Sequence, residues 1–161
     1  MRGYPSLLNE TVLSLIKYRL EQARGCLDSA MREFGADAYD SAANRSYYCV
    51  FHAMRAVLAT DTFDAKKHSG IISAFQQKYI KTGTFSPTFS KLIRNAFINR
   101  SKSDYEDFFV MTKEDVSELI DDAKTFLAAI EGYLKEMINS TEASSAETIV
   151  AATGLTREEA E

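Results

Sequence analysis

A row of polar side chains with different chemistries marks the second quarter of the chain. Asn44, Tyr48 and His52 recur every four residues, so they share one face if this segment is helical. Arg45 lies beside the row and Arg55 continues it. An amide, a phenol, an imidazole and guanidiniums on one face could bind phosphate and move a proton. The alternative is a buried hydrogen-bonding seam between helices, which suits Asn44 and Tyr48 better than His52.

A second polar cluster is the short motif Lys67-His68-Ser69-Gly70, just ahead of an apolar segment. If a helix begins here, its free N–H groups and its dipole would attract an anion, and Lys66 and Lys67 would add positive charge. Ser69 is also an ordinary helix N-cap. His68 could therefore contact a phosphate or only cap a neighbouring helix.

A third cluster holds Arg94, Arg100, Lys102, Asp104 and Tyr105. Arginine near a helix C-terminus often satisfies carbonyl groups and complements the dipole. Asp104 could pair with Arg100 across that turn. The same arrangement could also hold a scissile phosphate, so a structural role and a binding role both remain open.

Positive charge concentrates in the middle of the chain, although the net charge is −4. Residues 44–102 hold ten Lys and Arg but two Asp and Glu, whereas residues 103–161 hold four and fifteen. Such a basic centre attracts phosphate of a nucleotide or nucleic acid, or else pairs with the acidic last third. Between Ala65 and Ser103 there is no acid, and the basic residues are Lys66, Lys67, Lys78, Lys81, Lys91, Arg94, Arg100 and Lys102.

The bulk composition describes a cytoplasmic domain with a proper core. A chain of 161 residues, 45% of them hydrophobic, fits one globular domain. We expect no membrane span, no signal peptide, no cofactor and no metal, because apolar runs are short and Cys and His lack zinc-ligand spacing. Cys26 and Cys49 are expected to be free thiols in a reducing compartment.

Apolar periodicity predicts an all-α fold, an antiparallel up-and-down bundle of about five helices. The first helix covers about 6–34, and the second runs from an N-cap at Asp37 or Asp40 to about Thr60. A shorter third helix ends near Gly83. Ser86-Pro87 and Thr112 begin the fourth and fifth helices, and the fifth is about 26 residues long. The bundle should occupy 1–139, leaving 140–161 as an acidic tail that is a short helix or disordered.

Three segments in this order resemble the HEPN domain (higher eukaryotes and prokaryotes nucleotide-binding), in its branch of small stand-alone prokaryotic proteins. They are ANRSYYCVFHA at 43–53, KHSGIISAF at 67–75 and RSKSDY at 100–105. The resemblance covers roughly residues 8–138. It implies a helical bundle that dimerises, and a minimal nucleotidyltransferase partner in a toxin–antitoxin-type pair.

In ribonuclease members of the family, an Arg is followed after four to six residues by a catalytic His. This chain departs from that pattern, because neither Arg94 nor Arg100 has such a His and Asp104 stands near the expected place. A carboxyl with an ordinary pKa of about 3.9 is a poor substitute near neutral pH. His52 or His68 could substitute only if the fold brings one of them near Arg100.

Three functions follow from these residues. The first is an HEPN module that binds nucleotide or RNA and pairs with a nucleotidyltransferase. The second is a metal-independent endoribonuclease toxin. The missing Arg–His spacing favours the first over the second. The third is a purely structural interaction protein.

The candidate catalytic residues are Arg100, His52 and His68. The polar row Asn44, Tyr48 and His52 on one helix face is a separate candidate site. The candidate phosphate- or nucleotide-binding residues are Arg45, Lys67, His68, Arg94, Arg100, Asp104 and Tyr105. We also expect a homodimer, because the aromatic residues Tyr105, Phe108 and Phe109 crowd one linker.

Overall fold

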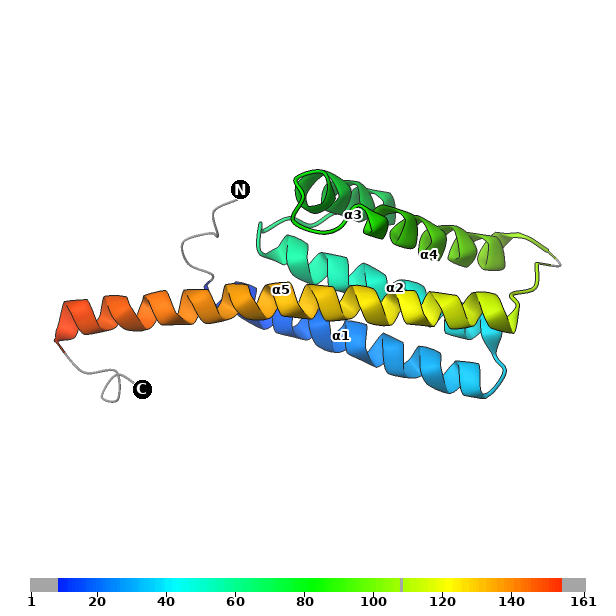
Figure 1. Ribbon diagram of the computed structural model, residues 1–161, viewed down its shortest axis with the longest axis horizontal. Helices are drawn as coiled ribbons and strands as arrows, with labels where there is room; N and C mark the ends of the chain where they lie inside the picture. Colours follow the sequence, from blue (N-terminus) through cyan, green and yellow to red (C-terminus); the bar gives the residue numbers. More distant parts are fainter. Residues whose placement is uncertain (1–8, 108, 155–161) are drawn as a thin grey trace.

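The computed structural model describes residues 9–107 and 109–154, which form helices joined by short connections and contain no strand (Figure 1). This confirms the predicted all-α bundle. The helices are α1 (Glu10–Gly35), α2 (Tyr39–Ala59), α3 (His68–Phe75), the π-helical turn η1 (Gln76–Ile80), α4 (Thr88–Tyr105) and α5 (Lys113–Thr153).

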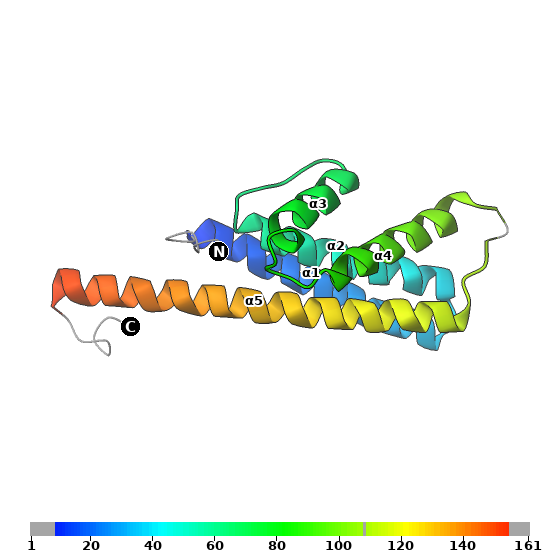
Figure 2. The ribbon, with the colours of Figure 1, turned by 45° about the horizontal axis from the view of Figure 1, so that its top comes forward.

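Helix α2 is the central element of the bundle and packs against α1, α3, α4 and α5. Figures 1 and 2 show α1 and α5 running along one side of α2, with α3 and α4 on the other. This position explains the composition of α2, in which most side chains are buried and small alanines allow close approach. Polar groups on α2 therefore meet other elements rather than solvent.

Helix α5 is much longer than the sequence predicted, with 41 residues instead of about 26. The apolar repeat fades after Met137, but no proline or glycine follows Gly132 until Gly154, so nothing stops the helix. Gly154 adopts the left-handed conformation (φ 67°) and its N–H bonds to the Val150 carbonyl, which ends the helix. Residues 140–153 therefore continue α5, and Figure 1 shows this end projecting past the other helices.

The predicted N-caps of the second and third helices were wrong, although both helices begin where the sequence indicated. Helix α2 begins at Tyr39 without a side-chain cap, because Asp37 sits in the left-handed region (φ 59°) and bonds to the Tyr39 hydroxyl instead. Helix α3 begins at His68, so Ser69 lies inside its first turn and does not cap it. The Thr112 cap is confirmed, since its hydroxyl accepts a hydrogen bond from the Asp115 N–H at 3.1 Å.

The third predicted helix consists of two pieces, α3 followed by η1. The wider π turn places Tyr79 in the core, where the side chain is 2% exposed. It also places the ammonium of Lys78 4.2 Å from the Phe63 ring centroid. Lys78 is thus half-buried in a cation–π contact.

Candidate functional site

Four ring-bearing residues form a continuous surface where α2 meets the start of α3. We call this set, Tyr47, Tyr48, Phe51 and His68, the ring platform. The His68 ring stacks on Phe51 with centroids 4.2 Å apart, and the Tyr47 hydroxyl lies 2.8 Å from His68 Nδ1. The Tyr48 ring meets His68 edge-on at 5.8 Å. Because three members lie on consecutive turns of α2 and His68 is the first residue of α3, two helices fix the platform.

Two guanidiniums lie over the tyrosines of the ring platform. The Arg100 guanidinium carbon, from α4, is 5.3 Å from the Tyr47 centroid and 5.6 Å from the Tyr48 centroid. Its Nη2 donates a long hydrogen bond of 3.5 Å to the Tyr48 hydroxyl. Arg45 sits 5.1 Å from the Tyr48 centroid and donates to Asn44 Oδ1 at 2.7 and 3.2 Å. Both are cation–π contacts that hold positive charge at this surface.

The two histidines are both shifted toward the neutral form. Burial, followed by the positive charges of Arg55 and Arg45, lowers the pKa of His52 to about 4. Burial and the charges of Arg100 and Arg55 lower the pKa of His68 below its ordinary value. His52 Nδ1 is a buried polar atom with no hydrogen-bond partner in the described part of the chain. Both imidazoles are therefore neutral at pH 7 and can accept a proton.

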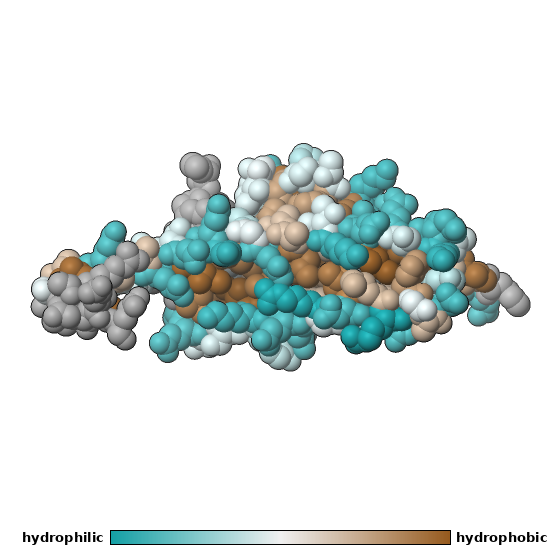
Figure 3. Space-filling view, turned by 60° about the horizontal axis from the view of Figure 1, so that its bottom comes forward, coloured by the Kyte–Doolittle hydropathy of each residue, from teal (hydrophilic) through white to brown (hydrophobic). Residues whose placement is uncertain are grey.

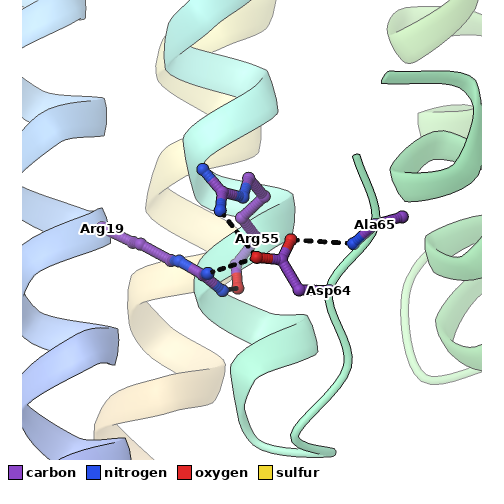
Figure 4. A network of polar contacts seen from close by, with 4 residues as sticks. All are labelled: Arg19, Arg55, Asp64 and Ala65. Carbon is purple, nitrogen blue, oxygen red and sulfur yellow. Dashed lines mark hydrogen bonds and ion pairs between the residues drawn. The ribbon is translucent and has the colours of Figure 1, made fainter. Parts of the chain in front are cut away.

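A second charged group joins Arg19 of α1 and Arg55 of α2 to Asp64 on the α2–α3 connection (Figure 4). The Asp64 carboxylate accepts hydrogen bonds through Oδ2 from Arg19 at 3.2 Å and from Arg55 at 2.9 Å. Its Oδ1 accepts from the Ala65 N–H at 2.9 Å. Arg19, which is buried, also donates to the Arg55 carbonyl at 2.8 Å. One carboxylate thus ties the connection to both α1 and α2.

Beside this group is an open pocket of about 470 Å³. Its lining combines the Phe51 and His68 rings with charged side chains from the α2–α3 connection. Arg55 enters from α2, with its guanidinium carbon 5.8 Å from the Phe51 centroid. The lining residues are Phe51, Arg55, Asp64, Ala65, Lys66 and His68.

The fold brings together most, but not all, of the residues that the sequence singled out. Arg45, His68 and Arg100 meet on the ring platform, and the row Asn44, Tyr48 and His52 runs along its α2 side. The earlier condition that a histidine must lie near Arg100 is therefore met by His68, since both contact Tyr47.

Three of the candidates have other surroundings. Lys67 is exposed at the N-cap of α3. Arg94 is exposed beside a separate hollow between α3 and α4. Tyr105 is 83% exposed at the end of α4. The side chain of Asp104, and Phe108, lie outside the described residues.

Sequence reasoning missed Arg19 and Asp64, and it assigned Tyr47 and Phe51 only to the core. A signal for Arg19 was present, because it lies three residues after Ile16 and four before Ala23, on the buried stripe of the first helix. A charge at such a position needs a partner. Nothing local indicated Asp64, since its partners are 9 and 45 residues away.

The described residues contain no group of three or more His, Cys, Asp or Glu side chains placed to hold a metal ion. In the same part of the chain, no helix has the length and apolar character to cross a membrane. Cys26 and Cys49 are free thiols.

Comparison with known proteins identifies the fold and the family. The HEPN domain matches residues 16–133. A Thermotoga maritima protein named UPF0332 is 32% identical over 123 residues, which cover 76% of this chain and 93% of that protein. A Methanocaldococcus jannaschii protein named "Putative toxin" is 30% identical over 133 residues, or 83% of this chain and 98% of that one. The crystal structure of an archaeal HEPN homologue has a TM-score of 0.54 at 19% identity, covering 73% of this chain and 96% of that one.

Proposed function

We propose a function from the premise that this chain belongs to the HEPN domain family: it is a toxin-like HEPN module that binds nucleotide or RNA phosphate on the ring platform. It works in the cytoplasm as the partner of a minimal nucleotidyltransferase, in a toxin–antitoxin-type pair. The observation that supports this most is the convergence of Arg100, Arg45 and His68 on Tyr47 and Tyr48. Guanidiniums bind phosphate with paired hydrogen bonds, and the half-buried rings of Tyr48 and His68 are the platform members on which a base can stack.

The placement of the cations favours this function over a purely structural one. A guanidinium that lies over an aromatic ring keeps its N–H groups at the ring edge, where they can donate to an incoming anion. Arg45 makes no ion pair in the described part of the chain and bonds only to Asn44. The positive charge of Arg45 therefore remains available to a phosphate.

A second candidate is metal-independent RNA cleavage, and one observation favours it. His68 lies on the same tyrosine as Arg100, so an Arg–His pair exists in space although the usual sequence spacing is absent. With its pKa lowered, His68 is neutral at pH 7 and could take a proton from a 2′-hydroxyl. Arg100 would stabilise the charge that develops on the phosphate.

A homodimer and a nucleotidyltransferase are the proposed partners. Tyr105 and Val110, on either side of the α4–α5 connection, are 83% and 78% exposed, and Phe109 between them is half-buried. Figure 3 shows a further apolar band along one face of the molecule. Exposed apolar surface of this kind is typical of a subunit contact. Light scattering at tens of micromolar should give the mass of a dimer, and a monomer mass would exclude the dimer.

The binding proposal is tested by titrating single-stranded RNA and ATP into wild type, Arg100→Ala and Lys91→Ala at two salt concentrations. Lys91 is the matched control, because it is an exposed basic residue of the same helix as Arg100. We expect Arg100→Ala to weaken binding at least about tenfold, the cost of losing a charge-assisted hydrogen bond. It should also flatten the salt dependence by about 0.7 in log–log slope for single-stranded RNA. Lys91→Ala should change little.

Two outcomes decide between the alternatives. Equal affinity of wild type and Arg100→Ala would remove the ring platform as the binding site and leave a structural role. Metal-independent cleavage by wild type that His68→Ala abolishes, while RNA binding persists, would establish the ribonuclease candidate. The nucleotidyltransferase partner is tested by co-expression with a neighbouring nucleotidyltransferase gene and co-purification through a tag on this chain.

A further inference from the structure

The pocket beside Asp64 carries more positive charge than its carboxylate can balance. Arg19 and Arg55 share one carboxylate, and within the described residues neither of them contacts another. Lys66, which also lines the pocket, is exposed and makes no ion pair in the same part of the chain. Because both guanidiniums are at least partly removed from water, their excess charge is costly until an anion offsets it.

A donor in the same pocket also lacks a partner. Arg55 Nε is a buried nitrogen without a hydrogen-bond acceptor in the described residues, although its Nη2 is bound to Asp64. Buried N–H groups of this kind are uncommon in folded proteins and call for a ligand or water. The unpartnered donor and the excess positive charge belong to one side chain, and they point to an anion.

Asp64 itself is not placed to read a base or sugar. Its Oδ2 already accepts two hydrogen bonds and its Oδ1 accepts one, which leaves one free lone-pair position on the carboxylate. Because it accepts hydrogen bonds from three donors, the Asp64 carboxylate acts instead as a structural clamp. It fixes the α2–α3 connection to Arg19 and Arg55, and the connection leads directly into His68.

We propose that this pocket is a second phosphate subsite, in which Arg55 and Lys66 bind the phosphate next along a nucleotide chain from the one held at Arg100. The proposal rests on the binding function proposed above. His68 lies between the two subsites, because it bonds to Tyr47 on the Arg100 side and stacks on Phe51, which lines the pocket. A ligand that spans both must carry two phosphates, so a dinucleotide reaches both subsites only when its 5′-hydroxyl is phosphorylated.

The test compares the diadenylate ApA, which has one phosphate, with its 5′-phosphorylated form pApA, which has two. Both are titrated into wild type, Lys66→Ala, Lys91→Ala and Arg100→Ala, and binding is followed through the ring resonances of His68 by NMR. Lys66 and Lys91 are both exposed lysines, so neither substitution threatens the fold. In wild type and Lys91→Ala, the 5′-phosphate should raise affinity about fivefold, which is what one screened ion pair can contribute.

In Lys66→Ala the preference for pApA should fall below about twofold, with ApA affinity unchanged. An undiminished preference in Lys66→Ala, or equal binding of pApA and ApA to wild type, would overturn the second subsite. Arg100→Ala reports separately on the proposed function, since it should weaken both ligands. If Arg100→Ala has no effect on either ligand, the ring platform fails as a site, whatever Lys66 shows.

Discussion

Two tyrosine-centred polar clusters lie along α2, one around Tyr79 of η1 and one around Tyr47 of α2, and they differ in their charge. At the C-terminal end of α2, the buried Tyr79 hydroxyl donates to Asp61 at 2.7 Å and lies 3.1 Å from the Thr60 hydroxyl, which donates to the Val57 carbonyl. Toward the middle, the buried Tyr47 hydroxyl meets His68, with the Arg100 guanidinium over its ring. The first cluster is built from hydroxyls and a carboxylate, and the second from an imidazole and cations.

This difference in charge distinguishes the Tyr79 cluster, a structural seam, from the Tyr47 cluster, a candidate site, more clearly than the types of residue do. Both tyrosines are fully buried, and burial raises the pKa of each, that of Tyr47 to about 12. Around Tyr79 the neighbouring groups hydrogen-bond to one another, so the cluster is complete without a ligand. In the ring platform around Tyr47, His52 contacts Tyr48 and Arg55 contacts Phe51, and His52 Nδ1 and Arg55 Nε have no hydrogen-bond partner within the described residues. A pocket also opens beside Phe51 and His68. The second cluster thus has the properties that a phosphate could complete.

The largest expected effect comes from removing one hydroxyl from each cluster. Tyr79→Phe removes the hydrogen bonds that the phenol makes with buried Thr60 and half-buried Asp61, so it should cost about 1–3 kcal/mol in the free energy of unfolding. Tyr47→Phe removes one contact to a half-buried ring and should cost about 0.5–1.5 kcal/mol. Urea unfolding of both variants measures these values.

RNA affinity should change in the opposite order, with the larger effect in Tyr47→Phe. Tyr79→Phe should bind like wild type, whereas Tyr47→Phe should bind more weakly, because the His68 ring loses the bond that orients it. If Tyr79→Phe also lost affinity without unfolding, the distinction between a seam and a site would be wrong.

The sequence predicted the helices and part of the ring platform better than it predicted the pocket. The apolar repeat located the helices, and Tyr48 and His68 of the platform stood out because polar residues break that repeat locally, whereas Tyr47 and Phe51 belong to the repeat itself. The pocket could not be predicted in this way. Its clamp joins Arg19, Arg55 and Asp64 across three elements, and only the packing of α1 on α2 brings them together. Local signals also failed at the end of α5, where weak apolar content was mistaken for the end of the helix.

A smaller effect should appear in the pH dependence of stability. The pKa of His52 is about 4 in the folded protein and about 6.5 when unfolded, so the unfolded state binds a proton first as the pH falls. This stabilisation is complete above pH 6.5 and is lost progressively toward pH 4, and His68 shifts in the same direction. After discounting for solvent screening, we expect a loss of about 1 kcal/mol between pH 7 and pH 5.

Urea unfolding of wild type and His52→Gln at the two pH values isolates this contribution. The variant has no imidazole at this position, so its stability should change less between pH 7 and pH 5 than that of wild type. Equal pH dependence of the two proteins would mean that His52 titrates normally in the fold. A matched substitution at His68 would then show which histidine, if either, is held neutral at the platform.

The smallest effect is expected from a change outside both clusters, the removal of residues 140–161. This segment contributes one buried side chain among its described residues, Thr141, whose hydroxyl bonds within the helix to the Met137 carbonyl. Because the core side chains of α5 end at Met137, truncation after Asn139 should leave the thermal midpoint nearly unchanged. A fall of more than about 8 °C, or more than about 2 kcal/mol, would show that the segment is packed. RNA affinity should not change either, since the ring platform and the pocket are formed by α2, α3, α4 and the α2–α3 connection. Lost affinity at unchanged stability would instead place part of the binding surface on the projecting end of α5.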